Sequence, residues 1–470
     1  MVPNNLKGLE RIKNQAVHDS QASTYLQELI DGIGPRLTGS PEAAKAGSWA
    51  LERMRRIGLS NVHAEEWTLD RGWQRGFARA RLLRPSGLEL NISSYGWAGS
   101  TPSGGVEAEV VPVDNDNIPE EIQKNAKGWR DKVLLLEPGK AEHPIRDYSE
   151  LTLLVTAATA AHAVAIIARD QRPGVMLTHT KPVALPPSIA SVVDDIPVVD
   201  IAAEHQAVLE RALKAGRSPR IHIEVSNHVS QGPVKAANII GEIPGSEQRS
   251  QIVVVAAHLD SWDLGSGAID DGFGVAAVLD AARLILALEL KPLRTIRFIL
   301  FTGEEQGLLG SRAYLASHQA ELPNHVCALV MDWGQGPITA IHLAGRQELV
   351  PSFQRFVSSM TDWSTVKVDK DYLHFTDAFS FTVAGIPGIA LGQDSPNLTL
   401  QGHSAADTLD KIDPTVLAKN AGFLALIAAS AATDPERLGV RWPPDKTAQV
   451  LIDDKERIML QLAGQWLLPQ

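Results

Sequence analysis

Cysteine is almost absent from this chain. Cys327 is the single cysteine among 470 residues, so no disulfide can form within the chain. It lies in the apolar run Val-Cys-Ala-Leu-Val-Met, which predicts a small buried residue rather than a reactive thiol.

A surplus of basic residues is also missing. The chain has 44 Lys and Arg against 55 Asp and Glu, which gives a formal net charge of -11. Because such a surface does not attract phosphate, nucleic acid is not an expected partner.

Long apolar runs are lacking too, since each is broken by Gly, Pro or charge before the roughly 20 residues of a membrane span. We therefore expect no membrane association.

The first 19 residues lack the apolar stretch that a signal peptide needs. The sequence accordingly predicts a cytoplasmic protein, or a secreted or periplasmic one if a leader was removed from this chain. A hydrophobic content of 44% and a charged content of 21% are typical of a soluble globular protein. The length of 470 residues predicts two or three domains.

Composition and periodicity divide the chain into four parts. Residues 1–100 are expected to open the main domain, 101–233 to form an insertion, 234–433 to complete the main domain and 434–470 to form an extension. In the first part, Ser40 is a predicted N-cap for a helix over Pro41–Ile57 that ends at Gly58. The extension contains one predicted helix, Ala448–Ala463.

The insertion alternates short strands with helices. Its predicted helices are Leu151–Arg169 and Ala202–Ala215. Its predicted strands are Val106–Val113, Val133–Leu136, Gly174–Leu177, Ile196–Asp200 and Ile221–Val225. None of these strands ends in a group of residues that could bind a metal, which favours a non-catalytic module.

The third part has alternating strands and helices around a buried strand. The run Val253–Ala257 is apolar on both faces, which predicts a central strand with helices on either side. The other predicted strands are Ala237–Glu242, Thr295–Thr302, Val326–Asp332, Thr339–Ala344 and Gly388–Leu391. We expect an α/β fold in which a mixed, mostly parallel sheet is sandwiched by helices.

Ionisable residues follow the predicted strands of this sheet. His258 and Asp260 come after the first strand, and Glu304 and Glu305 after the second. Residues just past parallel strand ends converge on one crevice, so these side chains are expected to meet.

Five residues at such positions or in adjoining loops have side chains that zinc accepts. They are His258, Asp270, Glu305, Asp332 and His403. Two ions can share one carboxylate, and this set gives each ion one His and one further carboxylate. Spacing alone leaves the choice between Asp270 and Asp271 open.

The motifs around these residues resemble those of the M28 di-zinc exopeptidase family, and within it the plasma glutamate carboxypeptidase (carboxypeptidase Q) branch. The matching segments are His258-Leu259-Asp260, Gly267 to Gly272, Gly303 to Ser311, Asp332 and Gly402 to Thr408. The resemblance covers roughly residues 19 to 433 and includes Gly34 to Ser40. It implies a zinc-peptidase fold in which the insertion is a protease-associated domain.

The resemblance also implies roles for the site residues. Asp270 would bridge two Zn2+ ions, with His258 and Asp332 on one and Glu305 and His403 on the other. Glu304 would be the general base. From its position two residues after His258, Asp260 is expected to accept the second N–H of the imidazole, with a solvent-facing turn residue as the alternative. The peptide after Asp270 is expected to be cis. The substrate would be a dipeptide or a short peptide with a free terminus, and a homodimer is left open.

Two other functions are compatible with parts of this pattern. A single-zinc acyl transferase of the glutaminyl cyclase type shares this fold, but the double ligand set disfavours it. A binding protein on a peptidase fold that has lost its metals is disfavoured because no ligand position is missing.

Overall fold

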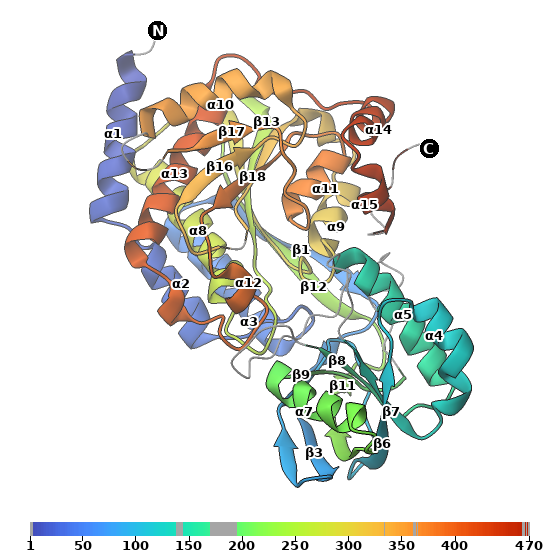
Figure 1. Cartoon of the computed structure of the whole chain (residues 1–470). Helices are drawn as coiled ribbons and strands as arrows, with labels where there is room; N and C mark the ends of the chain where they lie inside the picture. Colours follow the sequence, from blue (N-terminus) through green and yellow to red (C-terminus); the bar gives the residue numbers. More distant parts are fainter. Residues whose placement is uncertain are drawn as a thin grey trace.

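The computed structural model describes residues 3–137, 144–169, 195–332, 334–360, 363, 365–462, 466 and 468. It contains two eight-stranded sheets and a two-stranded ribbon. Figure 1 shows the larger, helix-covered part above and a smaller part, built on the second sheet, below it. The ribbon, β2 (Trp73–Gln74) with β11 (His228–Val229), lies in the two segments that connect these parts.

The main sheet has the order β1-β12-β14-β13-β15-β18-β16-β17. Its strands are β1 (Ser60–Leu69), β12 (Val234–Ile243), β14 (Arg294–Phe301), β13 (Gln248–His258), β15 (His325–Val330), β18 (Gly388–Gln393), β16 (Ile338–His342) and β17 (Lys367–Asp369). The four central strands, β14, β13, β15 and β18, are parallel, whereas β1, β12 and β16 pair antiparallel with a neighbour. The carboxyl ends of the central strands therefore lie at one edge of the sheet.

Helices cover both faces of this sheet, as the apolar central strand predicts. On β13, Val253 and Val255 belong to one apolar cluster, and Val254 and Ala256 to another. The first cluster includes side chains of α1 (Pro3–His18), α2 (Ala22–Gly32), α3 (Pro41–Ile57), α8 (Phe273–Ala287), α10 (Val350–Val357) and α13 (Pro414–Thr433). The second includes side chains of α9 (Leu309–Ser317) and α11 (Asp377–Val383). The predicted α/β sandwich is confirmed.

Two helices show how the sequence sets local structure. The Ser40 hydroxyl accepts the backbone N–H of Ala43, and Gly58 ends α3 with a φ of 98°, so both predicted caps are confirmed. Helix α13 is long and apolar enough to cross a membrane, but 78% of its most apolar window is buried inside the protein. It therefore serves as a core helix, packed against α8.

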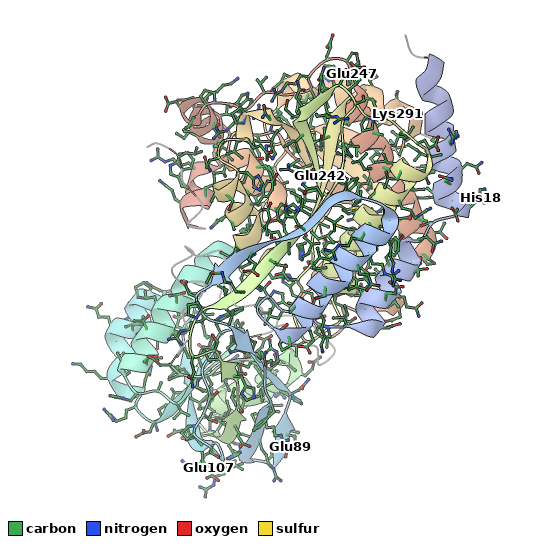
Figure 2. All side chains as sticks on the ribbon, turned by 180° about the vertical axis from the view of Figure 1, so that it is seen from behind. His18, Glu89, Glu107, Glu242, Glu247 and Lys291 are labelled. Atoms are coloured by element: carbon green, nitrogen blue, oxygen red, sulfur yellow. The ribbon has the colours of Figure 1, made fainter. Side chains whose placement is uncertain are left out.

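The second sheet has the order β4-β3-β10-β6-β7-β8-β9-β5. Its strands are β4 (Leu88–Leu90), β3 (Ala78–Arg84), β10 (Arg220–Val225), β6 (Val106–Val113), β7 (Lys132–Leu136), β8 (Ala165–Arg169), β9 (Val198–Ile201) and β5 (Ile92–Ser94). Helices α4 (Ile118–Asn125), α5 (Pro144–Ala160) and α7 (Ala203–Lys214) accompany it. Figure 2 shows Glu89 and Glu107 at its tip, far from Glu247 and Lys291 at the opposite end of the molecule.

Several sequence-based expectations differ from the structure. Strands β3 to β5 join the second sheet although they precede residue 101, where the insertion was expected to start. The predicted helix Leu151–Arg169 is wrong at its end, since α5 stops at Ala160 and β8 follows. The predicted helix Ala448–Ala463 is two helices, α14 (Pro444–Asp453) and α15 (Arg457–Leu462). The predicted strand Gly174–Leu177 lies outside the described residues. The identification of the insertion as a protease-associated domain stays a prediction.

Candidate metal centre

The predicted site residues come together at the carboxyl edge of the main sheet. His258 is the last residue of β13, Glu304 and Glu305 follow β14, and Asp332 follows β15. Asp270 precedes α8, and His403 follows the short helix α12 (Leu398–Gln401). Parallel strands that end at the same edge deliver these ionisable groups from distant parts of the sequence.

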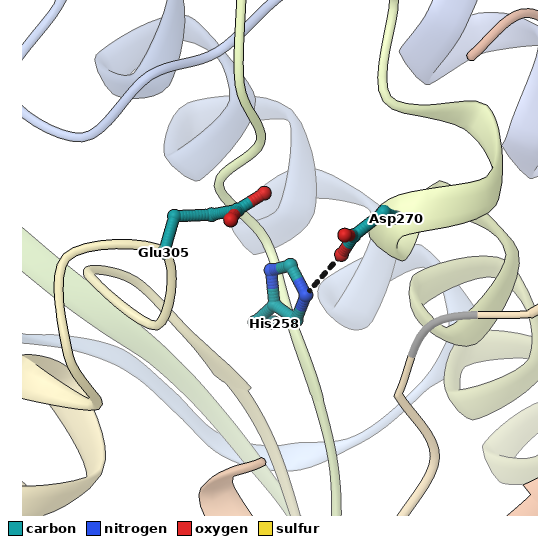
Figure 3. Close-up of side chains that lie close together, drawn as sticks. All are labelled: His258, Asp270 and Glu305. Atoms are coloured by element: carbon teal, nitrogen blue, oxygen red, sulfur yellow. Dashed lines mark hydrogen bonds and ion pairs between the residues drawn. The ribbon is translucent and has the colours of Figure 1, made fainter. Parts of the chain in front are cut away.

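Asp270 lies between the two imidazoles. Its Oδ1 is 2.9 Å from His258 Nε2, and its Oδ2 is 2.8 Å from His403 Nε2. Figure 3 shows the first of these contacts, with Glu305 on the other side of His258. Each oxygen of one carboxylate thus faces a different imidazole, which is the arrangement that a bridging ligand needs.

The other carboxylates surround this central group. Asp332 Oδ1 is 3.4 Å from His258 Nε2, and Glu305 Oε2 is 3.1 Å from His403 Nε2. Glu304 stands slightly further off, with its Oε2 4.0 Å from His258 Nε2. Ligand-type atoms of His258, Asp270 and Glu305 lie within 4.8 Å of one another. The structure brings all six of these side chains to one place.

The structure distinguishes Asp270 from its neighbour Asp271. The Asp271 carboxylate accepts the backbone N–H groups of His258, at 3.2 Å, and Gly274, at 3.0 Å. It also has an oxygen within 4.8 Å of ligand-type atoms of His258 and Asp332. The peptide between Asp270 and Asp271 is cis, as the family resemblance implied. Asp271 therefore holds the backbone of the site, whereas Asp270 faces both imidazoles.

The environment of Asp260 differs from the expectation. The nearest partner of His258 Nδ1 is the backbone carbonyl oxygen of Asp260, at 3.0 Å, and the carboxylate Oδ1 is 3.6 Å away. The carboxylate instead accepts the hydroxyl of Thr38 at 2.8 Å and the backbone N–H of Glu304 at 3.4 Å. The Asp260 carbonyl fixes the imidazole tautomer, and its carboxylate connects the ends of β13 and β14.

Burial sets the electrostatics of this cluster. It raises the pKa of Glu304 well above its usual value, and the nearby Asp332 raises it further. Burial, followed by repulsion from Asp270, raises the pKa of Glu305 to about 7. Burial also opposes ionisation of Asp270, but the two imidazoles outweigh it and lower the pKa of that group.

The charge balance of the cluster favours a bound cation. His258 is fully buried, and the side chains of Asp270, Glu305 and Asp332 are at most 6% exposed. His403 is the most open of the set at 30%. Buried carboxylates in excess over imidazoles are costly without a counter-ion. Imidazole nitrogens and carboxylate oxygens are zinc ligands, so the donor set fits that metal.

Sequence reasoning missed two residues that support the site. The fully buried Arg36 donates from Nε to the carbonyl oxygen of Leu259 at 2.6 Å and from Nη2 to that of Gly267 at 2.9 Å. Thr38 accepts the backbone N–H of Gly303 at 2.8 Å as well as donating to Asp260. Both lie in the Gly34 to Ser40 segment, which carried part of the family resemblance without an assigned role.

Asp407 connects two segments of the site. Its Oδ1 accepts the backbone N–H of Ile269 at 2.6 Å, and its Oδ2 accepts that of Asp270 at 3.3 Å. Asp407 thus ties the His403 loop to the backbone that carries Asp270.

Comparisons with known proteins agree with this geometry. The model of peptidase family M28 matches residues 238–428, a range that contains the six ionisable residues of the cluster but not Arg36 or Thr38. Carboxypeptidase Q of Pongo abelii is 30% identical over 432 residues, which cover 91% of this chain and 89% of that protein. The human carboxypeptidase Q is 29% identical over the same coverage.

Solved structures extend the likeness to the fold. A peptidase M28 precursor from Shewanella amazonensis matches with a TM-score of 0.79 and 29% identity, covering 94% of this chain and all of that one. A zinc aminopeptidase from Bacillus subtilis matches with a TM-score of 0.69 and 20% identity over 90% of this chain and 97% of that one, which supports the fold alone.

Proposed function

The chain belongs to peptidase family M28, and from that premise we propose that it is a co-catalytic zinc exopeptidase with two ions per chain. The observation that carries the proposal is the placement of Asp270, whose two oxygens face His258 and His403 separately. His258 and Asp332 would complete one ion's ligands, and Glu305 and His403 the other's. A single-ion site would need no carboxylate between two imidazoles.

When bound, zinc acts as a Lewis acid on the scissile carbonyl and lowers the pKa of the attacking water. The chain's own residues orient the ligands and move protons. The Asp260 carbonyl holds the proton of His258 on Nδ1, which leaves Nε2 free to ligate. The backbone N–H of Trp262 donates to Glu305 Oε1 at 3.2 Å, so Glu305 offers its other oxygen, Oε2, on the His403 side.

We assign the general base to Glu304. Its side chain is only 10% exposed and lies close to His258 without being the nearest carboxylate to either imidazole. Its raised pKa suits a carboxylate that takes a proton from water and returns it to the leaving amine. The substrates we propose are dipeptides or short peptides with a free terminus, in line with the names of the carboxypeptidase and aminopeptidase relatives.

A hydrolysis panel tests the proposal. Dipeptides and aminoacyl anilides are incubated with zinc-loaded protein, with chelator, and with Glu304→Gln. We expect the zinc-loaded protein to hydrolyse these substrates and the chelator to abolish hydrolysis. In Glu304→Gln the rate of hydrolysis is expected to fall by about 100-fold or more. Glu289→Gln is the control, because Glu289 is exposed at the C-terminal end of α8, away from the site. Undiminished hydrolysis by Glu304→Gln would overturn the assignment, and cyclisation of an N-terminal Gln peptide without hydrolysis would favour the acyl transferase.

A further inference from the structure

A second cavity lies away from the metal centre. It has a volume of about 260 Å³ and is bounded by α9, α11 and the segment that leads into α14, which lie together in Figure 1. Residues that line it include Arg312, Leu315, Leu322, Val383, Arg441 and Pro444. It shares no lining residue with the hollow at Asp270 and His403. The cavity is therefore a separate place on the described part of the molecule.

Two guanidinium groups line this cavity. Among the described residues, Arg312 has no side-chain hydrogen bond and neither arginine has an ion pair. Arg441 donates from Nε to the carbonyl oxygen of Ala384 at the end of α11, at 2.9 Å, which leaves its terminal nitrogens for other acceptors. Burial lowers the pKa of Arg312, and the charge of Asp377 offsets part of this decrease. Partly desolvated cations of this kind gain from an anionic partner.

Apart from Gln319 and Ser380, the other lining residues are apolar. Leu315 on α9 and Leu322 just beyond it are 7% and 0% exposed, and Val383 and Pro444 complete this side. Such walls offer an apolar chain a surface to bury, which an inorganic anion would not use. The volume is slightly below the roughly 300 Å³ at which pockets for drug-sized ligands begin, so the occupant is small.

We propose that this cavity binds a small organic monocarboxylate with a short apolar chain. The carboxylate pairs with Arg312 and Arg441, whose planar guanidinium groups match its geometry. The chain lies against Leu315, Leu322 and Val383. A free amino acid fits less well, because its ammonium group would be brought close to two positive charges. The site is independent of the peptidase activity proposed above.

Calorimetric titration of hexanoate into the zinc-loaded protein tests this site. We expect saturable binding with one hexanoate per chain, and binding at least about tenfold weaker in Arg312→Gln and in Arg441→Gln. Arg217→Gln is the matched control, because Arg217 is exposed and lies on the second part of the molecule. Hexanol lacks the charge and acetate lacks the chain, so both are expected to bind more weakly than hexanoate.

Two results would overturn the proposal. One is the absence of saturable binding to the wild-type protein. The other is equal affinity in the wild type and both arginine variants, which would place hexanoate elsewhere, for example on the zinc ions. Val383→Phe guards against a folding defect in the arginine variants, since it keeps both charges and fills the apolar wall. It is expected to weaken hexanoate binding while its melting curve stays cooperative, and unchanged binding would count against the cavity.

Discussion

Thr38 connects two of the segments that carry residues of the metal centre. It is fully buried, and its hydroxyl joins the segment after β13 to the segment after β14. Thr38→Val keeps the shape of the side chain but removes the hydroxyl. The Asp260 carboxylate then loses a hydrogen bond at 2.8 Å, and the Gly303 N–H is left without its acceptor at 2.8 Å.

The cost of Thr38→Val follows from these two losses. A buried hydrogen bond to a charged group and a buried unsatisfied N–H together amount to about 3 to 5 kcal/mol of unfolding free energy. Because Asp260 also presents the carbonyl that orients His258, zinc affinity is expected to fall by about 10- to 100-fold. Thr38→Ser keeps the hydroxyl and loses only one methyl group, worth roughly 1 kcal/mol.

Urea unfolding of the zinc-loaded proteins measures the first effect, and competition with a chromogenic chelator measures the second. We expect Thr38→Ser to resemble the wild type in zinc affinity and Thr38→Val to fall well below both. If the two variants were equally stable and bound zinc as tightly as the wild type, the supporting role of Thr38 would be refuted.

Three further predictions concern other parts of the molecule. Burial lowers the pKa of His325 to about 4, so the unfolded chain, titrating near 6.5, takes up the proton first as the pH falls. Unfolding free energy should therefore drop by up to about 3 kcal/mol between pH 6.5 and 4, and a weaker pH dependence in His325→Gln checks this. Leu329→Ala on β15, a fully buried position, should cost about 2 to 5 kcal/mol in urea unfolding, whereas Leu153→Ala at a 44% exposed position should cost under about 0.5. Glu304→Gln should retain its zinc content by elemental analysis, because its role is proton transfer rather than ligation; loss of one ion per chain would instead make it a ligand.

Residues at strand ends were the most predictable part of this protein. The apolar run of β13 and the ionisable groups after it identify a central strand and a site from local sequence alone. The two flanking helix caps of α3 were equally local signals. The choice of Asp270 over Asp271 was not, because neighbouring residues differ only in where the folded backbone turns their side chains.

Non-local pairing accounts for most of what was missed. Strand β3 pairs with β10, far along the chain, so nothing near residues 78–84 assigns it to the second sheet. The helix predicted through Arg169 breaks where His162 adopts a φ of 60°, and Ala165–Arg169 then joins β7 and β9. The predicted C-terminal helix likewise breaks at Lys455, whose φ is 67°. Thr38 and Arg36 gain their roles only from contacts with segments more than two hundred residues away.

Anomalous diffraction at the zinc edge tests the central claim most directly. We expect two peaks per chain, one beside His258 and Asp332 and one beside His403 and Glu305, with Asp270 in contact with both. A single peak in fully zinc-loaded crystals, or two peaks that do not share Asp270, would contradict it.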